Sequence, residues 1–346
     1  MSEEVTAALH IAVDAHDLAR DRRGIGRYVR AVLTRFARRA DIRLTLLVRD
    51  LFPFRHAQAM RDSIDAPQAR IANRVPRDAD VVWHPWNGTF FRANVPAVAT
   101  IHDVAPFAFP ASSEQRRESQ QAPFRRTAAT ADAIVCDSHF TAREVRRYLA
   151  VGETPLEVVA LGVDRVFSPG LADALPAALR GRRYLLYVGA HDAHKNVATL
   201  AAAYRAAFDP AECALVFTRA DPAIPDAVVC EGFDTAGLVA LYRAATIVAV
   251  PSLYEGFGLP VLEAMACGAP VIASRAASLP EVGGEAVRYV DAPEDVAQWT
   301  TVLRDLAASD IARADLARRG LLRATGFSWD RCADETLAVL RRVAHG

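Results

Sequence analysis

Short apolar runs alternate along the chain with longer stretches in which apolar residues recur every three or four positions. The short runs are rich in Val, Ile, Leu and Ala, as expected of strands buried on both faces of a parallel sheet. The longer stretches have the periodicity of amphipathic helices. We predict strands at residues 9–13, 42–48, 81–84, 97–101, 133–136, 156–160, 184–188, 214–217, 228–230, 246–250, 270–273 and 286–290.

Helices are predicted between most of these strands. One begins at Gly24 and another at Pro260. Strands and helices that alternate in this way predict an α/β fold with doubly wound parallel sheets. The other predicted helices cover residues 116–131, 140–149, 197–208, 236–244, 296–308, 311–324 and 329–343.

The chain is long enough for two domains. Of its 346 residues, 52% are hydrophobic and 24% are charged, so each half has enough apolar material for its own core. The alternation stops in the segment 161–178, which is rich in glycine and proline, and then restarts. We therefore predict two Rossmann-like domains, at residues 1–168 and 169–327, that face each other across a cleft.

The charge balance argues against nucleic acid as a partner. The 41 Lys and Arg equal the 41 Asp and Glu, so the formal net charge is zero. Residues 1–168 contain 24 Arg and 20 acids (+4), whereas residues 169–346 contain 17 Lys and Arg and 21 acids (−4). The excess in the first half favours an anionic acceptor or a peripheral membrane contact, although solvated helix faces have the same composition.

The cysteines and the apolar segments indicate a cytoplasmic protein. None of the five cysteines forms a C-x-x-C pair, and most lie in apolar runs, which predicts buried free thiols in a reducing compartment. The N-terminal decapeptide MSEEVTAALH lacks the apolar core of a secretory signal. No uninterrupted apolar run reaches the roughly 18 residues of a membrane span. We expect a cytoplasmic location, with a peripheral contact at the inner face of the membrane as an extension of it.

The segment 251–274, PSLYEGFGLPVLEAMACGAPVIAS, has the features of an anion-binding unit, and we expect the rest of the chain to be organised around it. It follows an apolar strand, and its loop contains Gly256 and Gly258, which let a ligand approach the backbone closely. Pro260 suits the first turn of a helix. A helix N-terminus behind a glycine loop presents backbone N–H groups to an anion such as phosphate.

Two carboxylates frame this unit. Glu255 precedes the glycines, and Glu263 lies one turn into the predicted helix. Because a carboxylate repels phosphate, we expect both acids to bind hydroxyl groups while backbone N–H groups bind the phosphates. That division matches a nucleotide-sugar, with ribose and sugar hydroxyls on either side of a diphosphate. On spacing alone, the alternative is an ordinary loop acid and a helix acid stabilised by solvent or by the helix dipole.

Lys195 is the only lysine in a chain that otherwise uses arginine. It follows the strand at 184–188 and Gly189, at the carboxyl end of a strand, where open α/β sheets bind ligands. Its compact ammonium group is suited to neutralising a diphosphate leaving group. The alternative is a chance lysine in an arginine-biased composition.

Two stretches in the first half follow predicted strands. The sequence GIGRY, from Gly24 to Tyr28, either turns backbone amides and Arg27 towards the cleft or is a tight turn before a helix. The long connection before it and the missing third glycine argue against a dinucleotide-binding fingerprint. His102 and Asp103 follow the strand at 97–101, and a histidine beside an acid at a strand end favours a functional role.

Other polar groups are weaker candidates. Asp78 and Asp80 form a D-x-D pattern, but they precede a strand, so a polar turn is predicted. The histidines of loop 191–194 have no distant partner ligands, so no zinc site is expected there. Ser138 belongs to no hydrolase motif and is predicted to cap a helix.

Glu255 and Glu263, with seven residues between them inside YEGFGLPVLEAMACGAPVIAS, resemble the E-x7-E signature of retaining glycosyltransferases with the GT-B fold. The chain is most similar to family 4 (glycosyltransferase group 1) and to its mannosyltransferase-like members. The resemblance covers nearly the whole chain. Further segments that match in the same order are IAVDAHDL, GIGRY, VATIHDVAPFAFP, ADAIVCDSHFTAREVRRYL, VVALGVDRVFSP, LLYVGAHDAHKN, VVCEGF, SLPEV and FSWDRCADETL.

The resemblance implies that the second domain binds the nucleotide-sugar donor and that the first binds the acceptor. It also implies that the last helix, about 328–346, crosses back onto the first domain. The implied reaction moves a hexose from a nucleotide-diphosphate sugar to a hydroxyl of a glycan or lipid-linked saccharide, in the synthesis of a cell-surface polysaccharide such as lipopolysaccharide. GIGRY, IHD and SLYEGFGLP favour GDP-mannose or a related GDP-sugar as the donor.

The resemblance also implies a role for each candidate residue. Glu255 would contact the transferred sugar, Glu263 the ribose, Lys195 the diphosphate, and His102 would lean towards the donor sugar. The other donor-binding residues would be Gly189, Gly232, Phe233, Gly256, Phe257, Gly258 and Leu259, and those of the phosphate loop and acceptor side would be Gly24, Gly26, Arg27 and Asp103.

The chain departs from the family pattern at the diphosphate. The family often has an arginine immediately before the lysine or after the glycine of the preceding strand, where this chain has His194 and Ala190. No carboxylate is placed as a covalent nucleophile, so we expect the leaving phosphate to accept the proton, without metal or cofactor. The alternatives are a nucleotide-sugar 2-epimerase of the same fold and a non-catalytic nucleotide-sugar-binding protein.

Overall fold

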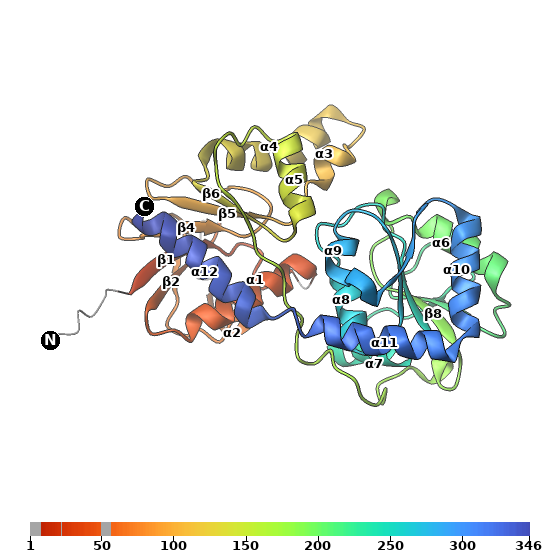
Figure 1. The fold of residues 1–346 in the computed structure, drawn as a ribbon. Helices are drawn as coiled ribbons and strands as arrows, with labels where there is room; N and C mark the ends of the chain where they lie inside the picture. The colour runs from red at the N-terminus through yellow and green to blue at the C-terminus, as the bar shows by residue number, and fades with distance from the viewer. Residues whose placement is uncertain (1–7, 22, 50–56) are drawn as a thin grey trace. The chain divides into compact units, whose positions relative to one another are not determined.

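A computed structural model describes residues 8–21, 23–49 and 57–346. The chain forms two compact units (Figure 1). Unit 1 comprises Met1–Gly162 together with Trp329–Gly346, and unit 2 comprises Val163–Ser328. The break falls at residue 162, whereas the sequence predicted it at residue 168, and the last helix belongs to unit 1.

In the described part of unit 1, seven strands form a parallel sheet in the order β3-β2-β1-β4-β5-β6-β7. The central strands are buried on both faces because their side chains are almost all apolar. The strands are β1 (Leu9–Asp14), β2 (Ile42–Leu47), β3 (Arg70–Ala72), β4 (Val81–His84), β5 (Ala97–Ile101), β6 (Ala133–Cys136) and β7 (Leu156–Val158).

The helices of unit 1 include α12, which returns to the sheet from the far end of the sequence (Figure 1). It packs against α1 and against β4 and β5. The Tyr28 ring of α1 lies 6.0 Å from Trp83 and 6.3 Å from Trp329, so one aromatic cluster joins α1, β4 and α12. The helices are α1 (Gly24–Ala37), α2 (Ala57–Ser63), α3 (Ala105–Ala108), α4 (Glu114–Thr130), α5 (His139–Tyr148) and α12 (Trp329–His345).

Unit 2 contains a parallel sheet of six strands in the order β10-β9-β8-β11-β12-β13. Its strands are β8 (Tyr184–Tyr187), β9 (Ala214–Phe217), β10 (Val228–Val229), β11 (Ile247–Val250), β12 (Val271–Ser274) and β13 (Arg288–Val290). Its α-helices are α6 (Val197–Ala207), α7 (Thr235–Ala244), α8 (Leu259–Ala266), α9 (Leu279–Gly283), α10 (Val296–Ala308) and α11 (Asp310–Ala324).

The core of unit 2 lies where α6 and α10 cover one face of this sheet. Trp299 of α10 is fully buried there with Tyr204 of α6 and Phe217 of β9. Burial of such large apolar side chains is the main term that holds a helix on a sheet.

The predicted α/β class with doubly wound parallel sheets is confirmed in each unit. All the predicted strands and helices are present, with ends that differ by a few residues. The elements α2, β3, α3 and α9 were not predicted, because they are too short for a hydrophobic period to be read. Ser138 caps α5 as predicted, since its Oγ accepts from the Thr141 amide at 3.0 Å. The five cysteines are buried and free, also as predicted.

Candidate active site

In unit 2 the site lies where the strand order reverses. The chain goes outward from β8 to β9 and β10 and then returns to β11, which pairs with the other side of β8. Loops that follow β8 and β11 separate in opposite directions at this point, and a crevice at the carboxyl ends of these strands is the usual ligand site of such sheets. Lys195 follows β8 and Glu255 follows β11.

The loop after β11 leads directly into the N-terminus of α8. Gly258 is the N-cap and has φ 109°, in the left-handed region, and a Cβ there would come within 2.8 Å of Leu279 Cδ2. A side chain at this position is therefore excluded by both the backbone angle and the space. α8 begins at Leu259, one residue before the predicted start, with Pro260 in its first turn.

The backbone carbonyl oxygens and the backbone amides of this loop differ in their hydrogen bonding. Ser278 Oγ lies 2.8 Å from the Glu255 carbonyl oxygen and 2.7 Å from that of Phe257. Among the described residues, no acceptor takes a hydrogen bond from the amides of Phe257, Gly258 or Leu259. The carbonyl oxygens are thus bound inside the unit, while three consecutive N–H groups at a helix N-terminus remain for an anion.

Lys195 ends a short 3-10 turn, Ala193–Lys195, which is fastened to the loop after β11. Asn196 has φ 54° and donates from Nδ2 to the carbonyl oxygens of Pro251, at 3.2 Å, and Pro293, at 2.7 Å. The Leu253 amide donates to the His194 carbonyl at 2.8 Å. These bonds fix the position of the lysine relative to Glu255.

Lys195 and Glu255, which are sixty positions apart in the sequence, form an ion pair. Lys195 Nζ lies 2.8 Å from Glu255 Oε1, and the two side chains are 19% and 14% exposed. Ser252 Oγ donates to the same carboxylate oxygen at 2.7 Å. An ammonium group held by a carboxylate can change partners when a diphosphate arrives, and the carboxylate then becomes available to a sugar hydroxyl.

Glu263 lies inside unit 2. It is 2% exposed, and Tyr242 of α7 donates its hydroxyl to Oε2 at 3.1 Å. The ring of Tyr242 packs edge-on against Phe167. Glu263 is therefore a buried helix acid, which rules out the alternative of a solvent-exposed one, and its contact with a ribose stays a prediction.

The remaining predicted donor residues occupy loops of unit 2. A Cβ on Gly189, which follows β8, would lie 2.8 Å from the Tyr187 hydroxyl oxygen. Phe233 is 41% exposed, and its ring packs over Gly237 in the first turn of α7. Gly232 has φ 73°, which suits glycine. An exposed aromatic ring of this kind is able to stack on a base, and this role stays a prediction.

In unit 1 the predicted glycines begin α1. A Cβ on Gly26 would lie 2.0 Å from the Asp21 carbonyl oxygen, so only glycine lets the preceding loop pass this close to the helix. Arg30 donates to the carbonyl oxygens of Leu18 and Asp21 and holds that loop. Gly24 and Arg27 lie in the first turn of the same helix.

His102 is buried at the end of β5, and both of its ring nitrogens are bound within unit 1. Nδ1 lies 2.7 Å from Asp137 Oδ2, and Nε2 lies 2.9 Å from the Pro85 carbonyl oxygen. Asp103 precedes α3 and accepts a hydrogen bond from the amide of Ala105, the first residue of that helix. The predicted contact of His102 with the donor stays a prediction; the structure shows the ring as the partner of a buried carboxylate.

Sequence reasoning did not name Asp137, Ser252, Ser278 or Tyr242 as site residues. Asp137 follows β6, the neighbour of β5, so it reaches His102 across adjacent strand ends. Ser252 precedes Glu255 by three positions, and Ser278 belongs to the SLPEV segment. Proximity to the central loop was a usable signal for Ser252, whereas Ser278 and Tyr242 are brought there only by folding.

The described residues contain no group of three or more His, Cys, Asp or Glu side chains arranged to hold a metal ion. His191 is bound to Asp221 at 2.8 Å. Asp80 accepts from the His10 amide at 2.7 Å, and Asp78 forms an ion pair with Arg43, so the D-x-D pattern is a structural turn, as predicted.

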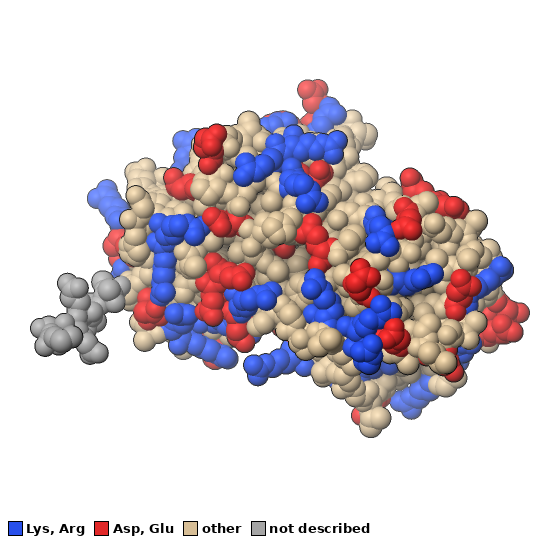
Figure 2. All heavy atoms as spheres, viewed as in Figure 1, with Lys and Arg blue, Asp and Glu red and all other residues tan. Residues whose placement is uncertain are grey.

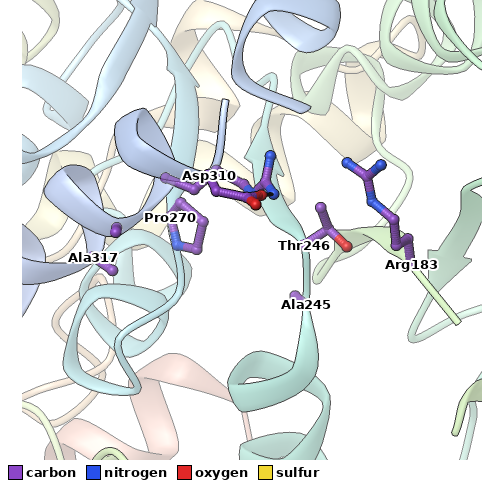
Figure 3. Close-up of a pocket in the computed structure, with 8 residues that line it drawn as sticks. Arg183, Ala245, Thr246, Pro270, Asp310 and Ala317 are labelled. Atoms are coloured by element: carbon purple, nitrogen blue, oxygen red, sulfur yellow. Dashed lines mark hydrogen bonds and ion pairs between the residues drawn. The ribbon is translucent and has the colours of Figure 1, made fainter. Parts of the chain in front are cut away.

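A hollow of about 450 Å³ lies at the amino ends of the strands of the unit 2 sheet, opposite the end at which the site lies (Figure 3). It is lined by Arg183, Thr246 and Pro270, which precede β8, β11 and β12, and by the start of α11. Arg183 donates to the Ala307 carbonyl at 2.6 Å and Arg313 to that of Leu306 at 2.8 Å, so both arginines cap α10. The hollow lies at the amino ends of the strands and is separate from the site.

In the part of the chain that the structure describes, no helix has both the length and the apolar character needed to cross a membrane.

Comparison with known proteins identifies the class. The family model "Glycosyltransferase Family 4" matches residues 22–167, and the model "Glycosyl transferases group 1" matches residues 182–309. The chain is similar over 97% of its length to the structure of sucrose-phosphate synthase from Thermosynechococcus elongatus, 99% of which is covered, with TM-score 0.76 and 21% identity. For WaaG, a glycosyltransferase involved in lipopolysaccharide biosynthesis, the TM-score is 0.68 at 14% identity, with 96% of this chain and 99% of that chain covered. The fold is that of a GT-B glycosyltransferase.

The chain belongs to glycosyltransferase family 4. It is 29% identical over 333 residues to O-antigen chain mannosyltransferase B of Escherichia coli, covering 88% of this chain and 81% of that protein. It is 34% identical over 236 residues to the MMP alpha-(1->4)-mannosyltransferase of Mycolicibacterium hassiacum, and here it spans 63% of its own length and 56% of the relative. The resemblance read from the sequence is confirmed.

Proposed function

We propose that this glycosyltransferase moves a hexose, with retention of configuration, from a nucleotide-diphosphate sugar to a hydroxyl of a glycan or lipid-linked saccharide. The observation that carries the proposal is the arrangement at the start of α8. Three open amides, an ammonium group and a carboxylate are grouped within one loop system. Amides and ammonium suit a diphosphate, and the carboxylate suits the hydroxyls of the adjoining sugar.

In the proposed reaction, these groups assist the transfer of the hexose to the acceptor. An acceptor hydroxyl oxygen forms a bond to the anomeric carbon while the bond from that carbon to the diphosphate oxygen breaks. The acceptor proton passes to the departing phosphate oxygen, on the same face of the sugar. Lys195 and the amides of Phe257, Gly258 and Leu259 stabilise the negative charge that develops on the leaving group. Glu255 orients the sugar through its hydroxyls.

We propose a GDP-sugar, with GDP-mannose favoured, as the donor. Two of the similar proteins are named as mannosyltransferases, which supports mannose as the sugar. One similar structure, Anabaena HepE, contains UDP and glucose, so a UDP-sugar is the main competitor. The chain has His194 and Ala190 where the family often has arginine, and a smaller number of cations at the diphosphate is expected to weaken donor binding.

The test is a screen of GDP-, UDP-, dTDP- and ADP-sugars by thermal shift, followed by an assay of donor hydrolysis with and without EDTA. The proposal expects stabilisation by one nucleotide class and slow, EDTA-resistant release of the sugar to water. Conversion of the donor to its 2-epimer without an acceptor would instead identify an epimerase. Binding without any turnover would identify a non-catalytic binding protein.

Ser252→Ala is expected to weaken binding of the sugar nucleotide about 5- to 10-fold, because Glu255 loses one of the two bonds that hold its Oε1. Affinity for the free nucleoside diphosphate should stay the same, since that ligand has no transferred sugar. Isothermal titration with both ligands measures the difference. The matched control is Ser274→Ala on β12, whose buried hydroxyl has no hydrogen-bond partner in the described part of the chain. Equal weakening for both ligands would contradict the role of Ser252.

We also propose that unit 1 contacts an anionic membrane surface through α4 and α5. Arginine side chains gather over these helices (Figure 2). The exposed arginines outnumber the exposed acids, Glu114 and Glu118, and Phe109 beside them is 42% exposed. Anionic headgroups attract such a surface. The exposed arginines are Arg116, Arg125, Arg126, Arg143, Arg146 and Arg147.

Arg146→Glu is expected to weaken co-sedimentation with phosphatidylglycerol vesicles about tenfold or more, because each basic residue near such a surface contributes about 1 kcal/mol. Phosphatidylcholine vesicles should bind weakly in all cases. Arg288→Glu, an equal charge change on β13 of unit 2, is the control. Equal loss of binding for the two variants would show that net charge, and not this surface, directs the contact.

A further inference from the structure

The strand order of unit 1 also reverses, between β1 and β4, and two titratable residues end these strands. Asp14 is the last residue of β1 and His84 the last of β4. The register pairs Val13 with Trp83, so Asp14 and His84 are adjacent at the carboxyl edge of the sheet. In unit 2, Lys195 and Glu255 lie in the loops that follow β8 and β11, the strands between which the order of that sheet reverses.

Asp14, His84 and Arg49 point to the same face of the sheet. Side chains two positions apart share a face, and the preceding residues Ala12, Val82 and Leu47 belong to one hydrophobic cluster. That cluster lies opposite the face on which Trp83 meets Tyr28 of α1. The three polar residues therefore lie on the same face as this apolar cluster, at the carboxyl ends of the strands.

Asp14 and Arg49 bind each other, whereas His84 does not take part in their contacts. Asp14 accepts from His16 Nδ1 at 2.8 Å and from Arg49 at 3.0 Å, and Trp86 Nε1 donates to the Asp14 carbonyl at 2.7 Å. The Arg49 guanidinium also stacks 3.5 Å above the Phe90 ring. Burial raises the pKa of Asp14, but His16 and Arg49 bring it below its ordinary value, so the carboxylate is charged.

His84 is fully buried, and among the described residues neither its Nδ1 nor its Nε2 has a hydrogen-bond partner. Burial lowers the pKa of His84 to about 4, so the ring is neutral at pH 7. A neutral imidazole presents one N–H donor and one nitrogen acceptor. A hydroxyl group both donates and accepts, so it satisfies either nitrogen, whereas an anion would meet an uncharged ring beside the Asp14 carboxylate.

We propose that His84 binds a hydroxyl of the acceptor and that the acceptor end of the substrate is a neutral saccharide. The inference rests on the proposed function. The His16 ring lies 5.6 Å from the Trp86 ring and 5.6 Å from the Phe90 ring, and these rings supply apolar surface for the CH groups of a sugar. Because His84 is buried, the hydroxyl reaches it only when the side chains that cover it move. A site whose buried polar groups form hydrogen bonds only with a hydroxylated ligand discriminates against a ligand that lacks the hydroxyl.

The test measures the ratio of transfer to hydrolysis for the full chain with its best donor. Acceptor probes are the methyl α- and β-glycosides of mannose, glucose, galactose and rhamnose, with mannose 6-phosphate as the anionic probe. We expect the wild type to use at least one neutral glycoside in preference to the phosphate. His84→Leu should lower the ratio about tenfold while its Tm stays at or above that of the wild type, because removing an unpartnered buried polar group is stabilising. His84→Gln, which keeps a donor and an acceptor, should recover part of the ratio.

The controls separate this inference from the function on which it rests. Ser274→Ala removes a hydroxyl in unit 2 that is also buried and also without a partner among the described residues, and it should leave the ratio unchanged. If the ratio for His84→Leu equals that of the wild type, His84 is an ordinary buried histidine and the inference is overturned. Transfer to mannose 6-phosphate alone, or to none of the probes, would also overturn it. Failure to hydrolyse any sugar nucleotide would overturn the proposed function itself.

Discussion

Lys195→Ala is expected to lower the kcat of donor turnover by about 10²- to 10³-fold, the usual cost of removing a group that stabilises developing charge. The ammonium group is 2.8 Å from Glu255 and is held there by a turn that is bonded to the loop after β11. In the proposed mechanism its charge acts mainly on the diphosphate as the bond to the sugar breaks. Donor hydrolysis under saturating sugar nucleotide measures the effect without any knowledge of the acceptor.

Glu263→Gln provides the contrast. The amide keeps an acceptor for the Tyr242 hydroxyl but removes the charge, so the main effect should be a higher KM for the donor. Since Lys195 is the only lysine, an amine-reactive reagent modifies only this side chain and the N-terminal amine, and bound nucleotide-sugar should protect it. A kcat of Lys195→Ala within about threefold of the wild type, or labelling that the donor does not slow, would remove Lys195 from the site.

His102→Ala is expected to destabilise unit 1 by about 3–5 kcal/mol, the typical cost of breaking a buried ion pair. Asp137 is 3% exposed, its Oδ2 accepts from His102 at 2.7 Å, and its Oδ1 has no partner among the residues that the structure describes. Without the imidazole, the carboxylate would be buried with no compensation. Urea unfolding followed by tryptophan fluorescence reports on this unit, because Trp83, Trp86 and Trp329 lie in it and only Trp299 lies in unit 2.

The same pair makes this loss depend on pH. Burial by itself lowers the pKa of His102, but the Asp137 charge and the hydrogen bonds to Asp137 and Pro85 outweigh it and raise the pKa above its ordinary value. The stabilisation by His102 is therefore complete below the unfolded pKa of about 6.5 and is lost as the pH rises through the folded-state pKa. The difference in unfolding free energy between wild type and His102→Ala should shrink above that point.

Asp137→Asn is the control for this prediction. An amide is able to donate to Nδ1 of a neutral imidazole whose Nε2 donates to Pro85, so the hydrogen bonds are kept and the charge is lost. We expect a loss of about 1 kcal/mol and a flatter pH dependence. Losses of equal size in the two variants, with the same dependence on pH, would contradict a charged pair.

Much of the candidate site was readable from local sequence. Gly256, Gly258 and Pro260 follow one another within a few residues, and the geometry of a strand, a glycine loop and a helix N-terminus is set by such short-range preferences. Lys195 was identifiable because it is unique in composition. The contact between Lys195 and Glu255 was not readable, because it depends on β8 and β11 being neighbours in the sheet.

The sequence alone determined the alternation of strands and helices, the division into two α/β halves and the family, because hydrophobic periodicity and consecutive motif residues are local properties of a chain. The tertiary structure alone decided which polar groups are bound and which are left open. It pairs Lys195 with Glu255 and His102 with Asp137, bonds the loop carbonyls to Ser278, and leaves His84 without a partner among the described residues. The contacts join residues that are distant in sequence and follow neighbouring strands. Strand order depends on the packing of the whole sheet, which no short segment specifies.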